Sequence, residues 1–173
     1  MKQMILVVGL LAALLTTAFG QGNTQVPAST AGTVNAQQSP PTSAQAKQIE
    51  AMVNKAAELV NKNGKAVFVE FRKKGSDWWS GNTYLFIYDL KSNVLLNPAF
   101  PQREGTNVAG KKDVKGKMYH DEFIKTVESK GSGWVDYMFP KPGQTEPSQK
   151  WSYVKAVNID GTPGLIGAGF YPE

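Results

Sequence analysis

The chain has 173 residues, of which 41% are hydrophobic and 19% are charged, and its formal net charge is +5. This size and composition predict one ordinary folded domain with additional segments. The sequence contains no cysteine and a single histidine, which excludes disulfides, cysteine-ligated metal centres and thiol catalysis. The mild basic excess lacks the long basic track with interleaved aromatics that is typical of nucleic-acid-binding domains. What remains favours a binding module over an enzyme.

The first twenty residues have the pattern of a secretory signal peptide. Lys2 gives a positive start, Met4–Phe19 is uncharged and mostly apolar, and Ala18-Phe19-Gly20 offers small residues for cleavage. The apolar run is shorter than the roughly 20 residues of a membrane-spanning helix. We therefore expect residues 1–20 to be removed and the remainder to be periplasmic or secreted. The alternative is an uncleaved anchor that tethers the same domain to the membrane.

Residues 21–45 are predicted to form a disordered linker. They include no charged residue, no aromatic residue and no Leu or Ile, and consist mainly of Gln, Ser, Thr, Pro and Ala. Such a segment buries too little apolar area to offset the entropy lost on ordering it. The folded domain is therefore expected over residues 46–173.

An amphipathic helix opens the folded part. Thr42-Ser43-Ala44-Gln45 has the spacing of a capping box, and apolar residues then recur at three- and four-residue steps as far as Asn63-Gly64. These apolar residues are Ile49, Met52, Val53, Ala56 and Val60. The next stretch, Ala66–Phe71, is β-branched and aromatic, and its propensity alone predicts a strand.

Strand-like segments and turn residues alternate through the rest of the chain. The predicted strands are Tyr84–Tyr88, Val94–Asn97, Trp134–Met138, Trp151–Val157 and Leu165–Phe170. A second amphipathic helix, marked by Tyr119, Phe123, Ile124 and Val127, ends at Gly131. A long helix followed by strands at hairpin spacing predicts an α+β fold, in which an antiparallel sheet packs on the N-terminal helix.

Four segments, in this order and spacing, resemble a known family. They are Gly81–Asp89, Gly131–Tyr137, Lys150–Lys155 and Gly167–Tyr171. Together with the long helix, they are similar to the single Cache domain of bacterial extracytoplasmic sensors. The resemblance implies a PAS-like central antiparallel sheet backed by the long helix, with a small-molecule pocket on the other face. It also implies that Ala66–Phe71 is helical, and we adopt that prediction over the propensity.

Two features depart from the family pattern. The family usually carries an imidazole at the position of Asn97, and an amide cannot take up charge as an imidazole does. Cache sensors also normally lie between two membrane spans and feed a cytoplasmic output domain, whereas this chain ends two residues after Tyr171. We therefore expect a separate signalling partner, such as a membrane-bound sensor kinase or chemoreceptor.

Period-2 alternation along the central strand predicts which side chains line the pocket. Leu85 and Ile87 suit the helix side, which leaves aromatic rings on the other face. Lys150, at the family's lysine position, is the candidate partner for a carboxylate, and the resemblance places Trp78 over the pocket mouth. The candidate ligand-binding residues are Trp78, Tyr84, Phe86, Tyr88, Asn97, Tyr137, Lys150 and Tyr153. For the tyrosines, ordinary core packing is the alternative.

The single histidine invites a metal-site interpretation that the sequence does not support. His120 precedes Asp121 and Glu122, but adjacent helix residues do not face one another, and further nitrogen or sulfur ligands are scarce. We predict a solvated helix end, no metal site and no cofactor. The lysines of residues 111–117 are likewise predicted to lie in a solvated loop.

Three functions remain, in decreasing order of support. The first is an exported, non-enzymatic Cache domain that binds a small organic ligand such as a short carboxylate. The second is a structural or interaction protein that keeps the fold and has lost the ligand. The third is a hydrolase that uses Lys150 and Ser152, for which no base and oxyanion donor can be assembled from the sequence.

Overall fold

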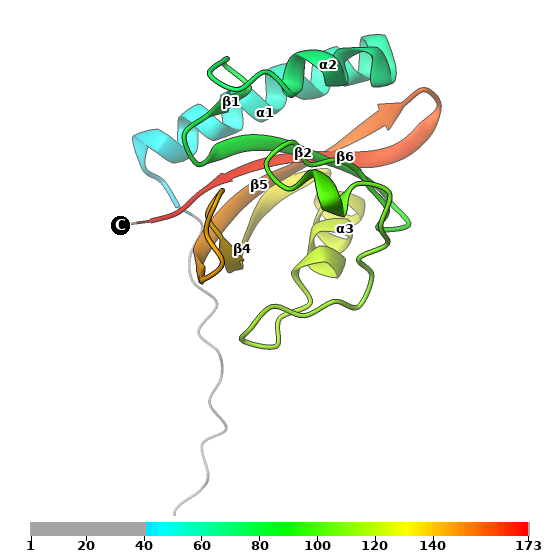
Figure 1. Ribbon diagram of the computed structural model, residues 1–173. Coiled ribbons are helices and arrows are strands. Elements are labelled where there is room, and N and C mark those ends of the chain that lie inside the picture. The colour runs from blue at the N-terminus through cyan, green and yellow to red at the C-terminus, as the bar shows by residue number, and fades with distance from the viewer. Residues whose placement is uncertain (1–40, 173) are drawn as a thin grey trace, which may run out of the picture. The chain divides into compact units, whose positions relative to one another are not determined.

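The computed structural model describes residues 41–172 (Figure 1). The predicted signal peptide and residues 21–40 of the predicted linker lie outside the described residues, and the last two linker residues, Ala44 and Gln45, instead begin helix α1. Within residues 41–172, no helix combines the length and hydrophobicity needed to cross a bilayer.

Helix α1, Ala44–Asn63, begins at a serine cap. The Ser43 hydroxyl accepts a hydrogen bond from the Ala46 amide at 3.2 Å, so Ser43 rather than Thr42 is the N-cap. The helix ends at Gly64, whose φ of 57° is in the left-handed region. The predicted apolar stripe is buried, as Ile49, Val53, Ala56 and Val60 show.

The segment after α1 is helical, as the family resemblance implied, and the strand predicted from propensity is wrong. It forms η1, Gly64–Val67, and α2, Phe68–Phe71. Phe68 and Phe71 are buried whereas Val69, between them, is 61% exposed. A three-residue spacing places both phenylalanines on one face of a helical turn, and burial of that face outweighs the β propensity of the stretch.

Six antiparallel strands form the sheet. They are β1 (Trp79–Ser80), β2 (Thr83–Asp89), β3 (Val94–Leu96), β4 (Ser132–Pro140), β5 (Pro147–Ile159) and β6 (Thr162–Phe170). The order across the sheet is β1-β2-β6-β5-β4, with β3 also paired to β2. The predicted α+β fold, with a long helix packed on an antiparallel sheet, is thus confirmed.

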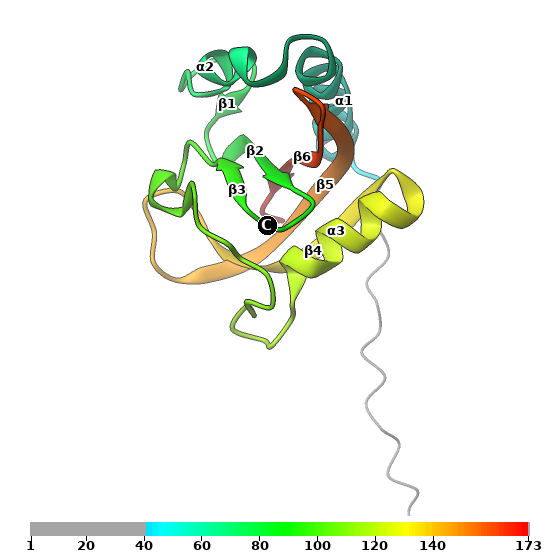
Figure 2. The ribbon, with the colours of Figure 1, turned by 90° about the vertical axis from the view of Figure 1, so that its right-hand side faces the viewer.

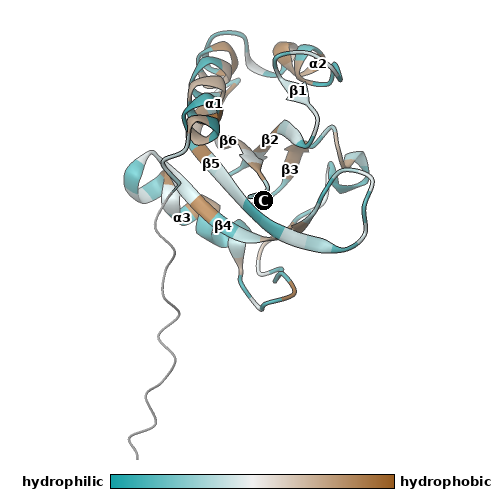
Figure 3. Cartoon of the chain, turned by 90° about the vertical axis from the view of Figure 1, so that its left-hand side faces the viewer, coloured by the Kyte–Doolittle hydropathy of each residue, from teal (hydrophilic) through white to brown (hydrophobic). Residues whose placement is uncertain are grey.

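Helices cover both faces of the sheet (Figures 1 and 2). Helix α1 lies on one face, and α3 (Tyr119–Lys130) lies on the other, after the short η2 turn (Pro101–Arg103). Strand segments beside α1 are hydrophobic, whereas the turn of the β4–β5 hairpin is hydrophilic (Figure 3). Two buried clusters result, one on each face, and the face away from α1 is called the far face below.

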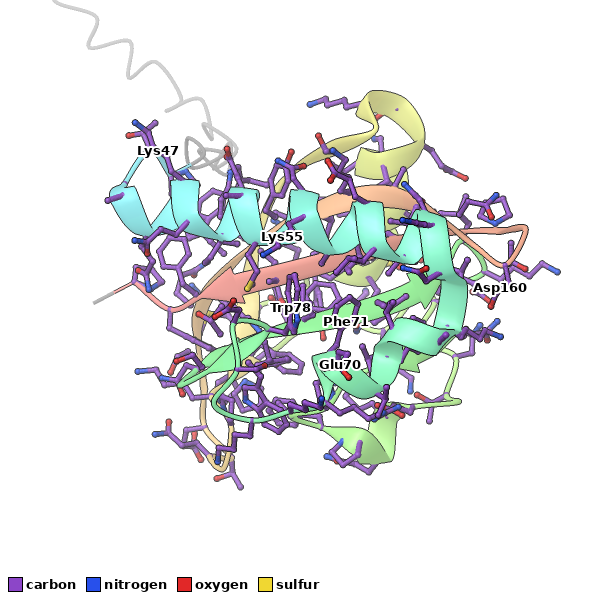
Figure 4. The ribbon with its side chains drawn as sticks, turned by 90° about the horizontal axis from the view of Figure 1, so that it is seen from above. Lys47, Lys55, Glu70, Phe71, Trp78 and Asp160 are labelled. Atoms are coloured by element: carbon purple, nitrogen blue, oxygen red, sulfur yellow. The ribbon has the colours of Figure 1, made fainter. Side chains whose placement is uncertain are left out.

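The C-terminal end of α1 contacts the tip of the β5–β6 hairpin. The Asp160 carboxylate accepts a hydrogen bond from the Lys65 amide at 3.1 Å, and Figure 4 places Asp160 beside the last turns of the helical segment. A Cβ atom at Gly64 would collide with that carboxylate. Gly64 is therefore required twice, for its positive φ and for the close approach of Asp160.

We expect Gly64→Ala to destabilise the protein by about 2 kcal/mol, because it combines backbone strain with a collision. Gly75→Ala is the matched control: Gly75 has a φ of 84°, but a Cβ atom there would meet nothing within 4 Å, so only the strain applies. Adding Asp160→Ala to Gly64→Ala should recover part of the loss. Denaturant unfolding compares these variants with the wild type, and equal losses for the two glycine variants would contradict the collision.

Candidate ligand-binding site

The far face of the sheet brings together polar side chains from strands that are distant in sequence. Tyr84 comes from β2, Tyr137 from β4, and Lys150 and Ser152 from β5. Lys150 is paired in register with Tyr137, and Ser152 lies between Val135 and Gly169. Leu85 and Ile87 pack on the α1 side, whereas Phe86 and Tyr88 pack on the far side, as the alternation predicted.

Glycines in β6 make space for these side chains. A Cβ atom at Gly169 would collide with the Ser152 hydroxyl and lie 3.0 Å from Cε of Lys150. A Cβ atom at Gly167 would meet the ring of Phe86. The lysine stem and the phenylalanine ring therefore lie across β6 only because this strand carries no side chain at those two positions.

Lys150 is buried without an acidic partner. It is 1% exposed, and its Nζ atom donates a hydrogen bond to the Tyr84 hydroxyl at 3.1 Å. Nζ also lies 4.3 Å from the ring centre of Tyr84, 5.3 Å from that of Phe139 and 5.2 Å from that of Tyr171. Burial, reinforced by the charge of Arg103, lowers the pKa of Lys150 to about 7.

Arg103 brings a second positive charge to one of these rings, that of Phe139. Its guanidinium carbon lies 5.1 Å from the ring centre of Phe139, and its Nη2 atom is 2.9 Å from Nε2 of His120. Arginine has only donors, so Nε2 must accept and the imidazole proton must be on Nδ1. Tyr84, Arg103, His120, Phe139, Lys150 and Tyr171 are together called the basic–aromatic cluster.

His120 is not the solvated helix end that the sequence predicted. It is 1% exposed, and its ring packs against those of Tyr88, Tyr119 and Phe123. The prediction was wrong because the first turn of α3 lies against the far face instead of in solvent. Burial, reinforced by the charges of Arg103 and Lys111, lowers the pKa of His120 to about 3, so the ring is neutral.

Three buried polar atoms beside the cluster have no hydrogen-bond partner among the described residues. They are Nε of Arg103, Nδ1 of His120 and Oδ1 of Asn97, and Nε1 of Trp79 near the sheet edge is a fourth. Buried polar atoms are nearly always paired in folded proteins. Two donors and one acceptor therefore remain available to a bound molecule.

Neighbouring carboxylates are committed to other groups. Glu104 accepts two hydrogen bonds from Arg72, both at 2.7 Å, and one from the Asn97 amide at 2.8 Å. Partial burial alone would raise the pKa of Glu104, but these hydrogen bonds outweigh it and the pKa is lowered. Asp136 pairs with Lys117 at 2.6 Å. Among residues 41–172, the ion pairs leave Lys150 and Arg103 without a counter-charge.

Four of the predicted site residues surround the cluster in different ways. The Tyr137 hydroxyl lies 3.0 Å from that of Ser152, and its ring stacks on Tyr119 with centres 4.2 Å apart. Phe86 and Tyr88 pack against Phe123 at 5.4 and 6.3 Å. Asn97 is buried just beyond the end of β3.

Trp78 and Tyr153 are not brought to the far face. Trp78 packs on the α1 side, 5.2 Å from Phe71 and beneath Lys55 of α1 (Figure 4). Tyr153 has the opposite parity to Lys150 on β5, contacts Trp134, and donates to Ser132. Their geometry assigns both to the packing between α1 and the sheet.

Sequence reasoning missed Arg103 and misplaced His120. Neither residue belongs to a local motif, and their proximity depends on how the connection between β3 and α3 folds back over the sheet. The sequence offered one indirect signal for Arg103, which is that the chain has only two arginines.

Comparison with known proteins shows the family of this chain. The sequence matches the family model for the Cache domain over residues 34–173. The chain belongs to the Cache domain family. This Cache domain resembles the methyl-accepting chemotaxis protein McpP of Pseudomonas putida, with 31% identity over 90 residues, which is 52% of this chain and 16% of that protein. It also resembles the sensor histidine kinase MctS of Rhizobium johnstonii, with 31% identity over 88 residues, which is 51% of this chain and 18% of the kinase.

Solved structures give the same result. A periplasmic sensor domain of a chemotaxis protein is 30% identical, with a TM-score of 0.61 over 75% of this chain and 95% of its own. A Cache chemosensory domain, solved to explain its recognition of carboxylic acids, is 28% identical with a TM-score of 0.65, at 75% and 95% coverage. The Cache domain described here is therefore related to extracytoplasmic sensor modules, and its chain spans less than a fifth of the curated relatives.

The buried neutral histidine should make stability depend on acid pH. The unfolded chain protonates His120 below about pH 6.5, whereas the folded protein does so only near pH 3. Stability should therefore fall as the pH drops from 6.5 towards 3, by at most about 1.4 kcal/mol per pH unit from this residue.

Glutamine at this position keeps an acceptor for Arg103 but does not titrate. His120→Gln should lose less stability than the wild type over the same pH range, measured by urea unfolding at several pH values. The chain has one histidine, so the difference between the two proteins reports on this site. Parallel pH profiles would show that the ring is solvated in the folded state.

Proposed function

We propose that this Cache domain is an exported, non-enzymatic sensor module that binds a small organic carboxylate and presents the bound state to a separate signalling partner. The observation that carries the proposal is the buried Lys150 beside the half-buried Arg103, two cations that have no acidic partner within the described residues. A carboxylate between them would supply the missing counter-charge and charge-assisted hydrogen bonds.

The surroundings of the two cations suit a small anion with an apolar body. The rings of Tyr84, Phe139 and Tyr171 lie around Nζ of Lys150, as in the mostly apolar, aromatic walls of small-ligand sites. The unpaired donors of Arg103 and His120 and the unpaired acceptor of Asn97 provide polar contacts. The related chemosensory domain whose structure explains carboxylic acid recognition supports the same ligand class.

The kinds of protein to which the relatives belong support an extracytoplasmic signalling role. They are a chemotaxis receptor and a sensor histidine kinase, and one solved neighbour is a periplasmic sensor domain. We infer that this domain acts outside the cytoplasm, after export by the N-terminal segment, and that a receptor or kinase of this kind reads its bound state.

A specific observation disfavours each alternative. A domain that had lost its ligand would retain a buried lysine with no counter-charge, at a cost in stability that an apolar residue would avoid. For a hydrolase, Lys150 would have to activate Ser152, but Nζ bonds to Tyr84 and the serine hydroxyl bonds to Tyr137.

Thermal unfolding in the presence of acetate, propionate, pyruvate and succinate tests the proposal. A ligand that binds only the folded state increases the free energy of unfolding, by about 2.7 kcal/mol at a hundredfold excess over Kd. The Tm therefore rises. We expect a rise of several degrees with at least one acid, and none with propionamide, which has the same shape as propionate but no charge.

Variants locate the effect. Lys150→Met and Arg103→Met should abolish the rise in Tm, whereas Lys62→Met, at an exposed lysine in the last turn of α1, should leave it unchanged. Lys150→Met should also be at least as stable as the wild type without ligand, because no desolvated charge remains. Absence of a shift with every acid, or a shift that survives both cluster variants, would overturn the proposed site.

A further inference from the structure

We propose that anion binding at the basic–aromatic cluster is coupled to the uptake of one proton by Lys150, so that the site responds to pH as well as to its ligand. This inference rests on the proposed function, because it concerns the same site. Binding would convert a neutral amine and a carboxylate anion, together with one proton from solvent, into an ammonium–carboxylate pair.

Two cations, the buried Lys150 and the half-buried Arg103, lie beside the same aromatic ring. Both lie close to the ring of Phe139, Arg103 at 5.1 Å and Lys150 at 5.3 Å from its centre. No carboxylate among residues 41–172 pairs with either one. Two like charges in one desolvated cluster are unfavourable, and arginine does not give up its proton in proteins. The lysine is therefore the group that becomes neutral.

The hydrogen bond from Lys150 is compatible with both protonation states. An ammonium donates to the Tyr84 hydroxyl at the observed 3.1 Å. A neutral amine has a lone pair and can instead accept from the same hydroxyl. The aromatic rings stabilise the ammonium only in part, since cation–π contacts are weaker than a fully formed ion pair. Loss of the proton from Lys150 therefore does not break its hydrogen bond with Tyr84.

Groups that face Lys150 from the other elements do not titrate near neutral pH. Burial raises the pKa of Tyr119 on α3 to about 12. The pKa values of Tyr84 on β2, Tyr137 on β4 and Tyr171 at the C-terminal end are also raised, chiefly by burial. His120 on α3 has its pKa lowered to about 3, and Arg103 stays charged.

Lys150 is left as the residue of the cluster that changes its charge in this range. Desolvation, together with the charge of Arg103, lowers its pKa to about 7 in the free protein. A bound carboxylate would favour the ammonium and raise that pKa. The affinity should then fall about tenfold per pH unit above 7, until the pKa of the bound lysine is reached.

Calorimetric titration of the full-length protein with propionate tests the coupling. At pH 8, in phosphate, HEPES and Tris buffers of different ionisation heat, the observed enthalpy should vary linearly with buffer heat and give uptake of close to one proton. Propionate is itself fully ionised here, since carboxyl groups have pKa values of about 4 to 5. At pH 6 the uptake should approach zero, and the affinity should be at least tenfold higher than at pH 8.

Two variants identify the group that takes up the proton. Lys62→Met, at an exposed lysine outside the cluster, should bind propionate with the same uptake as the wild type. Lys150→Arg keeps a charge that cannot be lost and should bind without proton uptake and with a flat affinity between pH 6 and 8. If arginine does not fit, NMR titration of the lysine side chains in the free wild type, with Lys150→Met for assignment, gives the same information. Lys150 should titrate near pH 7, well below the ordinary lysine value of about 10.4.

The outcomes separate this inference from the proposed function. Saturable binding of propionate with the same heat in every buffer and the same affinity at pH 6 and 8 would overturn the coupling and leave the carboxylate site standing. So would loss of the uptake in Lys62→Met, or a Lys150 that titrates near the ordinary lysine value of about 10.4. No binding at pH 6, where the lysine is charged, would contradict the proposed function itself.

Discussion

The far face of this domain is organised around positive charge that the described part of the chain does not neutralise. Lys150 is 1% exposed and shares the ring of Phe139 with Arg103. Desolvating a charge without a partner costs several kcal/mol even after relaxation. Part of that cost is avoided because burial lowers the pKa of Lys150 to about 7, and the α1 side contributes an apolar core in which Val53, Val60 and Ile166 are fully buried.

Other features of the structure keep the charge from being cancelled internally. Glu104 is saturated by Arg72 and the Asn97 amide, and Asp136 is held by Lys117. His120 meets Arg103 as a neutral acceptor, so it positions the guanidinium without neutralising it. Gly169 leaves space for the lysine to lie across β6. Each arrangement leaves positive charge on the far face that a small anion can neutralise.

The sequence was sufficient for the parts of the fold that depend on periodicity. The α1 stripe, strands β2 to β6 and the division of β2 into Leu85 and Ile87 against Phe86 and Tyr88 are local patterns, and they were predicted correctly. The same alternation places Tyr153 on the α1 side, because it lies three residues from Lys150 on β5 and side chains an odd number of residues apart point to opposite faces. Its inclusion among the pocket residues conflicts with this pattern.

The rest of the site was beyond local patterns. His120 and Arg103 come from different elements and meet only because the connection from β3 to α3 crosses the sheet. Nothing in the neighbourhood of either residue in the sequence indicates that contact. Burial of the histidine follows from tertiary packing against Tyr88 and Phe123, so propensity and spacing predicted a solvated helix end instead.

Adjacent residues at the end of η2 serve opposite sides of the molecule. Arg103 contacts His120 on the far face, while Glu104, in extended backbone, grips Arg72 just after α2 on the helical side. One peptide unit thus links the cluster to the layer that contains α1. Because the two residues are consecutive, a displacement of Arg103 by an incoming molecule would also shift Glu104 and its ion pair with Arg72. A change at the far face would in this way reach the layer of α1 and α2.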